Sequence, residues 1–193
     1  MDGRMLQNLF LYPSIRLKDG MDSGELGTFL DPRTVRFERV LSGPIERVWA
    51  YLTSPELLSA WLAGARVELY EGGRIELRIG GRDSRLAPPP AIVRGIVMKC
   101  RPPHLLSYTW TDPHTPASFV TFELEPTGLE VRLVLTHRRL ARGFLSAGAG
   151  GWHSLLGALG ARLRGEIPEP FQAVFDRVFP SYEARARAFG EGR

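Results

Sequence analysis

The feature that most constrains the fold is the segment 35–61, where the spacing of apolar residues changes from that of a strand to that of a helix. Val35, Phe37 and Leu41 share one face, which predicts a half-buried strand. A Ser-Gly-Pro sequence then predicts a turn, and apolar residues return after it at helical spacing. These residues are Ile45, Val48, Trp49 and Leu52. The segment therefore begins a domain with a strand followed by a helix.

A second, shorter helix is expected directly after the first. Ser54 is suited to the N-cap position, and Pro55 to the first helical position, where a missing backbone N–H has no partner to lose. Trp61 ends this helix. A strand and two helices, followed only by strands and one late helix, is the element order of a helix-grip fold, in which a curved sheet surrounds a long helix.

The middle of the chain predicts an antiparallel meander. Turn signals recur at intervals of roughly 8–12 residues, and the apolar residues between them alternate with polar ones. Glu71-Gly72-Gly73 is a hairpin turn, because glycine adopts positive φ without strain. The expected strands are 66–70, 74–79, 92–100, 105–110, 119–125 and 129–137. The polar and Pro-rich segment 80–90 and the segment 112–116 are expected to be loops.

One long helix is expected near the C-terminus. The Gly/Ala-rich stretch 147–151 leads into a helix of about 14 residues with a single apolar stripe, which ends before Gly165 and Pro168. The stripe consists of Trp152, Leu155, Leu156, Leu159 and Leu163. A curved antiparallel sheet needs an apolar element on its concave face, and this helix is the candidate long enough to fill it. The predicted fold class is therefore α+β, with the sheet wrapped around a C-terminal helix and a pocket where the two diverge.

The two ends of the chain are expected to differ from this core. A last amphipathic segment places Phe171, Val174, Phe175, Val178 and Phe179 on one face, and Pro180 is expected to break or kink it. Residues 1–24 contain the only asparagine and a short apolar run without a clear period. We interpret them as a tail that is disordered or that precedes the native start at Met21. Residues 25–193 are expected to form a single domain.

Composition and charge exclude several classes of protein. No run approaches the ~18 apolar residues of a membrane span, and the N-terminus has no apolar core of signal-peptide length. Cys100 is the single cysteine, which fits a reducing compartment, so we expect a cytoplasmic location. The net charge of +4 is spread over scattered arginines without a recognition motif, which argues against a nucleic-acid partner.

Several short motifs, each in the expected order, resemble the SRPBCC (START/Bet v 1-like) superfamily. They are VRFER at 35–39, GPIERVW at 43–49, AWL at 60–62, GGR at 72–74, PPHLLSYTW at 102–110, VTFEL at 120–124, LTHRRL at 135–140 and GWH at 151–153. Over about residues 25–190 the chain is most similar to bacterial AHSA-type proteins, which are named for an activator of a heat-shock-protein ATPase. The resemblance implies a helix-grip fold with a cavity. Members of the superfamily bind lipids, sterols, polyketides and other apolar molecules, and some are cyclases or dehydratases.

Candidate ligand-binding residues are those on the concave face of the expected sheet and on the stripe of the expected helix. The apolar ones would supply affinity, while His137 and Tyr108 would orient the ligand. His137 is also the one candidate general base. The expected wall consists of Trp61, Leu77, Val97, Tyr108, Trp110, Phe122, Leu133, His137, Trp152, Leu155 and Leu159. No His or Cys spacing typical of a metal site occurs, so we expect no metal and no cofactor.

Three functions are compatible with these observations. The favoured one is binding of a small apolar or amphipathic molecule between the sheet and the C-terminal helix. The second is a hydrolase, dehydratase or cyclase acting on such a molecule, with His137 as base. The third is an interaction module for a chaperone, a stress response or a regulator, which predicts an exposed apolar patch near Phe171 and Phe175. A monomer and a homodimer are both compatible with each function.

Overall fold

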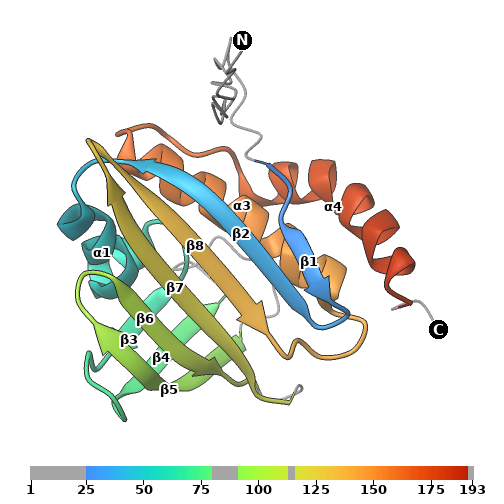
Figure 1. The fold of residues 1–193 in the computed structure, drawn as a ribbon, viewed down its shortest axis with the longest axis horizontal. Coiled ribbons are helices and arrows are strands. Elements are labelled where there is room, and N and C mark those ends of the chain that lie inside the picture. The colour runs from blue at the N-terminus through green and yellow to red at the C-terminus, as the bar shows by residue number, and fades with distance from the viewer. Residues whose placement is uncertain (1–24, 80–90, 113–115, 191–193) are drawn as a thin grey trace, which may run out of the picture.

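One antiparallel sheet of eight strands lies across helix α3 (Figure 1). The computed structural model describes residues 25–79, 91–112 and 116–190, so the expected tail 1–24, the expected loop 80–90 and most of the loop 112–116 lie outside it. The strands are β1 (Thr28–Asp31), β2 (Thr34–Ser42), β3 (Gly64–Val67), β4 (Arg74–Ile79), β5 (Ala91–Arg101), β6 (Leu105–Trp110), β7 (Ser118–Thr127) and β8 (Glu130–Arg138), in the order β1-β2-β8-β7-β6-β5-β4-β3. The helices are α1 (Ile45–Thr53), α2 (Pro55–Ser59), α3 (Leu145–Leu163) and α4 (Phe171–Ala188). The predicted α+β class and antiparallel order of strands are confirmed.

The apolar core lies between the concave face of the sheet and α3. The inward residues of β8, Val131, Leu133 and Leu135, are fully buried, as is Leu159 of α3. Helix α4 packs on α3, so α3 is buried on nearly all of its faces rather than along a single stripe. The sheet therefore wraps a helix that is itself covered from the other side.

The opening segment folds as its apolar spacing predicts. Val35 and Phe37 of β2 point into the core, and α1 and α2 follow the turn. Ser54 occupies the N-cap position of α2, but its hydroxyl donates to the Glu56 carboxylate at 2.7 Å rather than accepting from a backbone N–H. Trp61, just beyond α2, is fully buried, and its indole N–H donates to the Tyr51 carbonyl at 2.8 Å.

Two strands differ from the expectation. β3 ends at Val67, because the chain turns there: the Glu68 N–H donates to the Arg74 carbonyl at 2.9 Å, and the Tyr70 N–H donates to the Glu68 carbonyl at 3.0 Å. β1 is a short edge strand in which only Phe29 is buried. Four residues are too few for alternation to be recognised, so the sequence pattern does not indicate this strand.

Helix α3 begins at Leu145, so the Gly/Ala-rich stretch 147–151 belongs to the helix instead of leading into it. Glycine weakens a helix by about 1 kcal/mol relative to alanine, which is why local propensity favours a later start. The missing side chains allow close packing, because a Cβ at Gly150 would lie 2.9 Å from the Phe175 ring of α4. Tertiary contacts therefore override propensity at this end of the helix.

A break or a kink is predicted at Pro180; helix α4 continues through this residue, so the break does not occur. Proline removes one helical hydrogen bond, but Pro180 is exposed, and water can bond to the carbonyl left without a donor. Val178 and Tyr182 are buried on either side of it, and the Gly27 N–H donates to the Tyr182 hydroxyl at 2.8 Å. These contacts attach the helix to the core on both sides of the proline. Within the described ranges, no helix is long and apolar enough to cross a membrane.

Strand β5 lies between β4 and β6 and pairs with them mainly over different parts of its length, apart from a bridge between Arg94 and Thr111. Residues 91–96 pair with β4, whereas residues 97–101 pair with β6 in a register that shifts near the junction. Gly95 lies next to this junction, and a Cβ there would lie 1.9 Å from the Thr109 carbonyl oxygen of β6. Only a residue without a side chain lets the two backbones approach so closely. Gly95 is therefore required where the two parts of the sheet meet.

Candidate functional site

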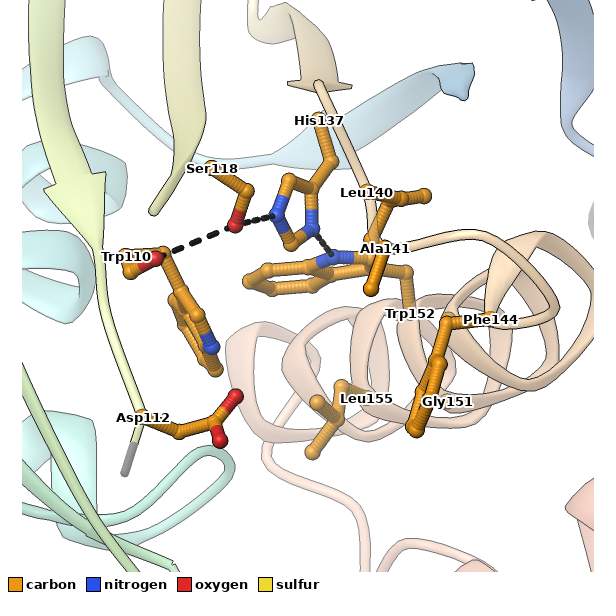
Figure 2. Close-up of a pocket in the computed structure, with 11 residues that line it drawn as sticks. Trp110, Asp112, Ser118, His137, Leu140, Ala141, Phe144, Gly151, Trp152 and Leu155 are labelled. Carbon is orange, nitrogen blue, oxygen red and sulfur yellow. Dashed lines mark hydrogen bonds between the residues drawn. The ribbon is translucent and has the colours of Figure 1, made fainter. Parts of the chain in front are cut away.

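A pocket of about 180 Å³ opens where β6 ends, β7 begins and α3 passes beside them (Figure 2). Antiparallel pairing places Trp110, the last residue of β6, opposite Ser118, the first residue of β7. His137 lies near the end of the neighbouring strand β8. The described lining consists of Trp110, Asp112, Ser118, His137, Leu140, Ala141, Phe144, Gly148, Gly151, Trp152 and Leu155. The pocket is thus built from three adjacent strand ends, the β8–α3 loop and one face of α3.

One chain of hydrogen bonds joins four of these residues, and Trp152 fixes its direction. An indole N–H can only donate, so His137 Nδ1 accepts from it at 2.9 Å and carries no proton. A neutral imidazole then has its proton on Nε2, which lies 2.8 Å from the Ser118 hydroxyl oxygen and donates to it. The Ser118 hydroxyl donates in turn to the Trp110 carbonyl at 3.1 Å. Figure 2 shows these three bonds in a line across one wall.

Burial keeps His137 neutral. Its side chain is buried, and this burial lowers its pKa from 6.5 to about 3, because an imidazolium ion would lose its hydration. The Nδ1 lone pair is occupied by the Trp152 N–H, so neither ring nitrogen has a free lone pair. In a catalytic serine–histidine pair the histidine nitrogen facing serine accepts the serine proton. Here that nitrogen donates, so the arrangement suits a fixed polar anchor rather than a general base.

Two glycines of α3 create the space in the pocket. Gly148 and Gly151 share a helix face with Trp152 and Leu155, at the spacing i, i+3, i+4 and i+7. A Cβ at Gly151 would meet nothing within 4 Å, whereas a Cβ at Gly148 would lie 3.3 Å from the Leu140 side chain. A larger residue at position 151 would therefore project into open space and fill the pocket.

The β8–α3 loop, which forms the rim, is held by a residue of the turn between β1 and the neighbouring strand β2. Arg33, between β1 and β2, donates from Nε to the Leu140 carbonyl at 2.7 Å and from Nη2 to the Arg139 carbonyl at 3.2 Å. The Leu140 N–H donates back to the Arg33 carbonyl at 2.9 Å. Arg139 has a φ of 61°, a left-handed conformation that non-glycine residues rarely adopt. Arg33 therefore positions the loop that carries Leu140 and Phe144 to the pocket.

Replacing Arg33 with alanine is expected to lower the free energy of unfolding by about 1–2 kcal/mol, since two carbonyls lose a charged donor. Arg33→Lys is expected to recover little of this loss, because lysine cannot supply a planar fork of N–H groups. Thermal unfolding measures the global loss, and hydrogen exchange of the amides of 140–144 measures loosening of the loop. Arg94→Ala is the control, because Arg94 is exposed and makes only a 3.5 Å ion pair. Equal effects of Arg33→Ala and Arg94→Ala would contradict the positioning role.

The structure brings together four of the eleven residues expected in the wall: Trp110, His137, Trp152 and Leu155 line the pocket. The other seven are buried in the core behind it: Trp61, Leu77, Val97, Tyr108, Phe122, Leu133 and Leu159. Tyr108 stacks on Trp110 with ring centroids 6.5 Å apart, and its burial raises the pKa of its phenol. These seven residues support the wall, but the pocket's surface is formed by others.

The residues that sequence reasoning missed lie at strand ends, in the loop and on α3. Side chains of a strand alternate between its two faces, and this alternation was a usable signal for Ser118. Ser118 lies two residues before Val120 of the same strand, which faces inward. The glycines share the helix face of Trp152, which was also a usable signal. Asp112, Leu140, Ala141 and Phe144 lie outside regular elements, where no periodicity indicates orientation.

Two further histidines are described, and neither lines the pocket. His153 faces α4, where its Nδ1 lies 3.0 Å from the Tyr182 hydroxyl. His104 lies between β5 and β6, and His114 is outside the described residues. Among the described residues, no group of three His, Cys, Asp or Glu side chains could hold a metal ion. A larger hollow of about 480 Å³ beside β2 and α3 has charged residues of both signs in its wall, which is typical of a solvated surface.

Comparison with known proteins supplies the family. Residues 42–164 match the family profile described as Activator of Hsp90 ATPase homolog 1-like protein. A protein from Bordetella parapertussis, solved by NMR, is 38% identical with a TM-score of 0.70, over 84% of this chain and 90% of that one. CalU16 from Micromonospora echinospora is 22% identical in its crystal structure, with a TM-score of 0.65, over 79% of this chain and 88% of that one; it shows the fold alone. No curated protein matches the chain significantly.

The matched segment extends from the last residue of β2 to the residue after α3. It includes every described residue of the pocket lining, whereas β1, most of β2 and all of α4 lie outside it. The match covers more than half of the chain, and the Bordetella relative is similar over most of both proteins. The chain therefore belongs to the Activator of Hsp90 ATPase homolog 1-like family of the SRPBCC superfamily, as its motifs indicate.

Proposed function

We propose that this protein binds one small, mainly apolar molecule in the pocket between the ends of β6, β7 and β8 and helix α3. One observation carries the proposal: a hollow of about 180 Å³ has aromatic and aliphatic walls, and the polar side chains of Ser118 and His137 within it are already hydrogen-bonded. An apolar cavity of about 150 Å³ holds one benzene ring. The pocket therefore fits a molecule with one or two rings.

Burial of apolar surface is expected to supply most of the affinity. A two-ring molecule that loses about 250 Å² of apolar surface gains roughly 6 kcal/mol at ~25 cal/mol per Å². Part of that gain is lost to ordering of the ligand and of the rim. Dissociation constants between about 100 μM and 1 mM are therefore expected. Trp110 and Trp152, whose ring centroids lie 5.6 Å apart, present the aromatic surface.

Binding is favoured over catalysis because of the state of His137. The enzyme hypothesis needs a base that can accept a proton, but both nitrogens of this imidazole are engaged and its pKa is lowered to about 3. Accepting a proton would require His137 to give up the bond from Trp152. A carrier or sensor needs only the shape and the fixed polar wall.

Binding is also favoured over the interaction-module hypothesis, which needs an exposed apolar patch on the last helix. Phe171 and Phe175 are only partly exposed, and their rings stack on each other with centroids 5.7 Å apart. Phe175 also packs over Gly150 of α3. These side chains therefore contribute to the packing of α4 rather than forming an open surface.

The proposal is tested by filling the pocket. Gly151→Leu places a side chain in the open space without a clash at its Cβ. We expect wild-type protein to bind at least one member of a panel of one- and two-ring compounds, measured by quenching of tryptophan fluorescence, and Gly151→Leu to bind it at least about tenfold more weakly. Gly157→Leu is the matched control, because it is on the same helix, its Cβ also meets nothing within 4 Å, and it does not line this pocket.

Two outcomes would contradict the proposal. One is a wild-type protein that binds no member of the panel and also retains no small molecule when it is purified from its own host and examined by native mass spectrometry. The other is a Gly151→Leu variant that folds and binds as tightly as the Gly157→Leu control. Circular dichroism and thermal unfolding of both variants establish that they fold.

A further inference from the structure

The large apolar side chains of the pocket lining differ in how tightly they are held. Trp152 and Leu155 are each 4% exposed, so neighbouring side chains fix their rotamers. Trp110 is half-buried, and its ring lies against those of His137 and Trp152, with centroids 5.8 and 5.6 Å away. Phe144 lines the same pocket but is 52% exposed, and exposed side chains change rotamer readily. Phe144 is therefore the part of the apolar wall that can move.

The backbone of Phe144 is fixed, so the movement is confined to its side chain. Its N–H donates to the Ala141 carbonyl at 3.1 Å, and its carbonyl accepts from the Gly148 N–H at 2.8 Å. Phe144 is the N-cap residue of α3, and the next residue, Leu145, is fully buried. Rotation about the side-chain bonds of Phe144 can therefore move its ring while the rim loop stays in place.

The pocket has room on the side toward which this ring can turn. A Cβ at Gly151 would meet nothing within 4 Å, so the Phe144 ring does not rest on the helix at that position. Figure 2 shows the rings of Phe144 and Trp110 on opposite sides of the pocket, with Leu155 between them in this view. A flat ring bound in this space would contact an aromatic side chain on each side. It would also remove the exposed part of Phe144 from water.

We propose that the pocket is selective for a flat aromatic ring system, which is held between Trp110 and Phe144, and that Phe144 closes over it by a change of rotamer. Aromatic pairs gain stability beyond the area that they bury. A saturated molecule with the same skeleton is thicker and has no π system, so it gains less between the two rings. This inference rests on the proposed function, because it specifies the ligand of the same pocket and the residue that encloses it.

Two ligands with the same skeleton and the same hydroxyl group test the proposal: 2-naphthol, which is flat and aromatic, and decahydro-2-naphthol, which is saturated. Their dissociation constants are measured by titration calorimetry at neutral pH in wild-type protein, Phe144→Leu and Phe144→Tyr. Leucine keeps an apolar side chain but removes the ring, whereas tyrosine keeps the ring. The ratio of the two constants within one variant is the quantity of interest, because a general loss of fit affects both ligands alike.

Phe189→Leu is the matched control. It makes the same chemical change at another exposed phenylalanine, which does not line the pocket. In wild-type protein we expect 2-naphthol to bind about fivefold more tightly than decahydro-2-naphthol. Phe144→Leu should lower this preference about threefold, because Trp110 alone then contacts the aromatic ring. Phe144→Tyr and Phe189→Leu should leave the preference unchanged.

A second readout uses wild-type protein alone, in case Phe144→Leu does not fold. Nuclear Overhauser effects should connect the protons of bound 2-naphthol with the ring protons of both Trp110 and Phe144. Effects to Trp110 without any to Phe144 would overturn the inference. A wild-type protein that prefers the saturated ligand, or equal preferences in Phe144→Leu and Phe189→Leu, would overturn it as well.

The experiment separates this inference from the proposed function. Binding of both ligands with equal affinity, lost for both in Gly151→Leu, would overturn the inference and leave the proposed function standing. Failure of both ligands to bind would overturn the inference, and failure of the wider panel as well would overturn the proposed function.

Discussion

Replacing Gly95 with alanine is expected to destabilise the protein by at least about 4 kcal/mol, the range reached only by the most disruptive single substitutions. The added Cβ would lie 1.9 Å from the Thr109 carbonyl oxygen and 2.8 Å from the Ile75 side chain. The carbonyl belongs to the backbone of the neighbouring strand, so no rotamer change relieves the clash. For a chain of this size the loss corresponds to a fall in Tm of roughly 10–15 °C.

Gly157→Ala is the control for this substitution. It makes the same chemical change in the interior of α3, where the added Cβ meets nothing within 4 Å. Because alanine is the better helix former, the control should raise stability by about 1 kcal/mol. Thermal unfolding followed by circular dichroism compares the two variants. A Gly95→Ala protein with a Tm within a few degrees of wild type would show that β5 and β6 do not approach each other as described.

Acidification is expected to destabilise the protein through His137. Its pKa is about 3 in the folded state and 6.5 when exposed, so between these values the unfolded state binds more protons. The free energy of unfolding therefore falls as the pH falls from 6.5 toward 3, by up to about 1.4 kcal/mol per pH unit. Between pH 7 and pH 4 the contribution of this one residue is about 3 kcal/mol.

Other groups titrate over the same range, so the measurement compares wild type with His137→Gln. Glutamine is a neutral hydrogen-bonding side chain that does not titrate, and the carboxylates and other histidines are common to both proteins. Urea unfolding at a series of pH values should give a steeper loss of stability for wild type below pH 6.5. Parallel curves for the two proteins would mean that His137 is not the buried neutral imidazole described above.

Much of the fold follows from local patterns that the sequence displays. β4 and β6 have the predicted bounds. A strand with one buried face has apolar residues at every second position, so this pattern in the sequence indicates where such a strand begins and ends. The start of α3 and the course of α4 through Pro180 depend instead on contacts between the two helices. Local propensity contains no information about such contacts, so it predicts a late start and a break.

The site was predictable only in part, for a related reason. The alternation of apolar and polar residues along the strands identified inward-facing residues such as Leu133 and Phe122. These residues are buried in the core, because neighbouring side chains fill the space in front of them. The space of the pocket exists because Gly148 and Gly151 have no side chains to fill it. It also depends on the position of the loop that Arg33 holds. Whether an inward residue meets a neighbour or a cavity is decided by tertiary packing and cannot be read from periodicity.

The pairing of β2 with β8 also determines the order in which the chain can fold during its synthesis. Val35 pairs with His137 and Ser42 with Glu130, so β2 leaves the ribosome long before its partner has been made. The Gly27–Tyr182 hydrogen bond, between residues 155 positions apart, ties the beginning of the domain to its final helix. Contacts between such distant residues form slowly, because a long loop has to close before they are made. The contact between Gly27 and Tyr182 can therefore form only after α4 has been translated.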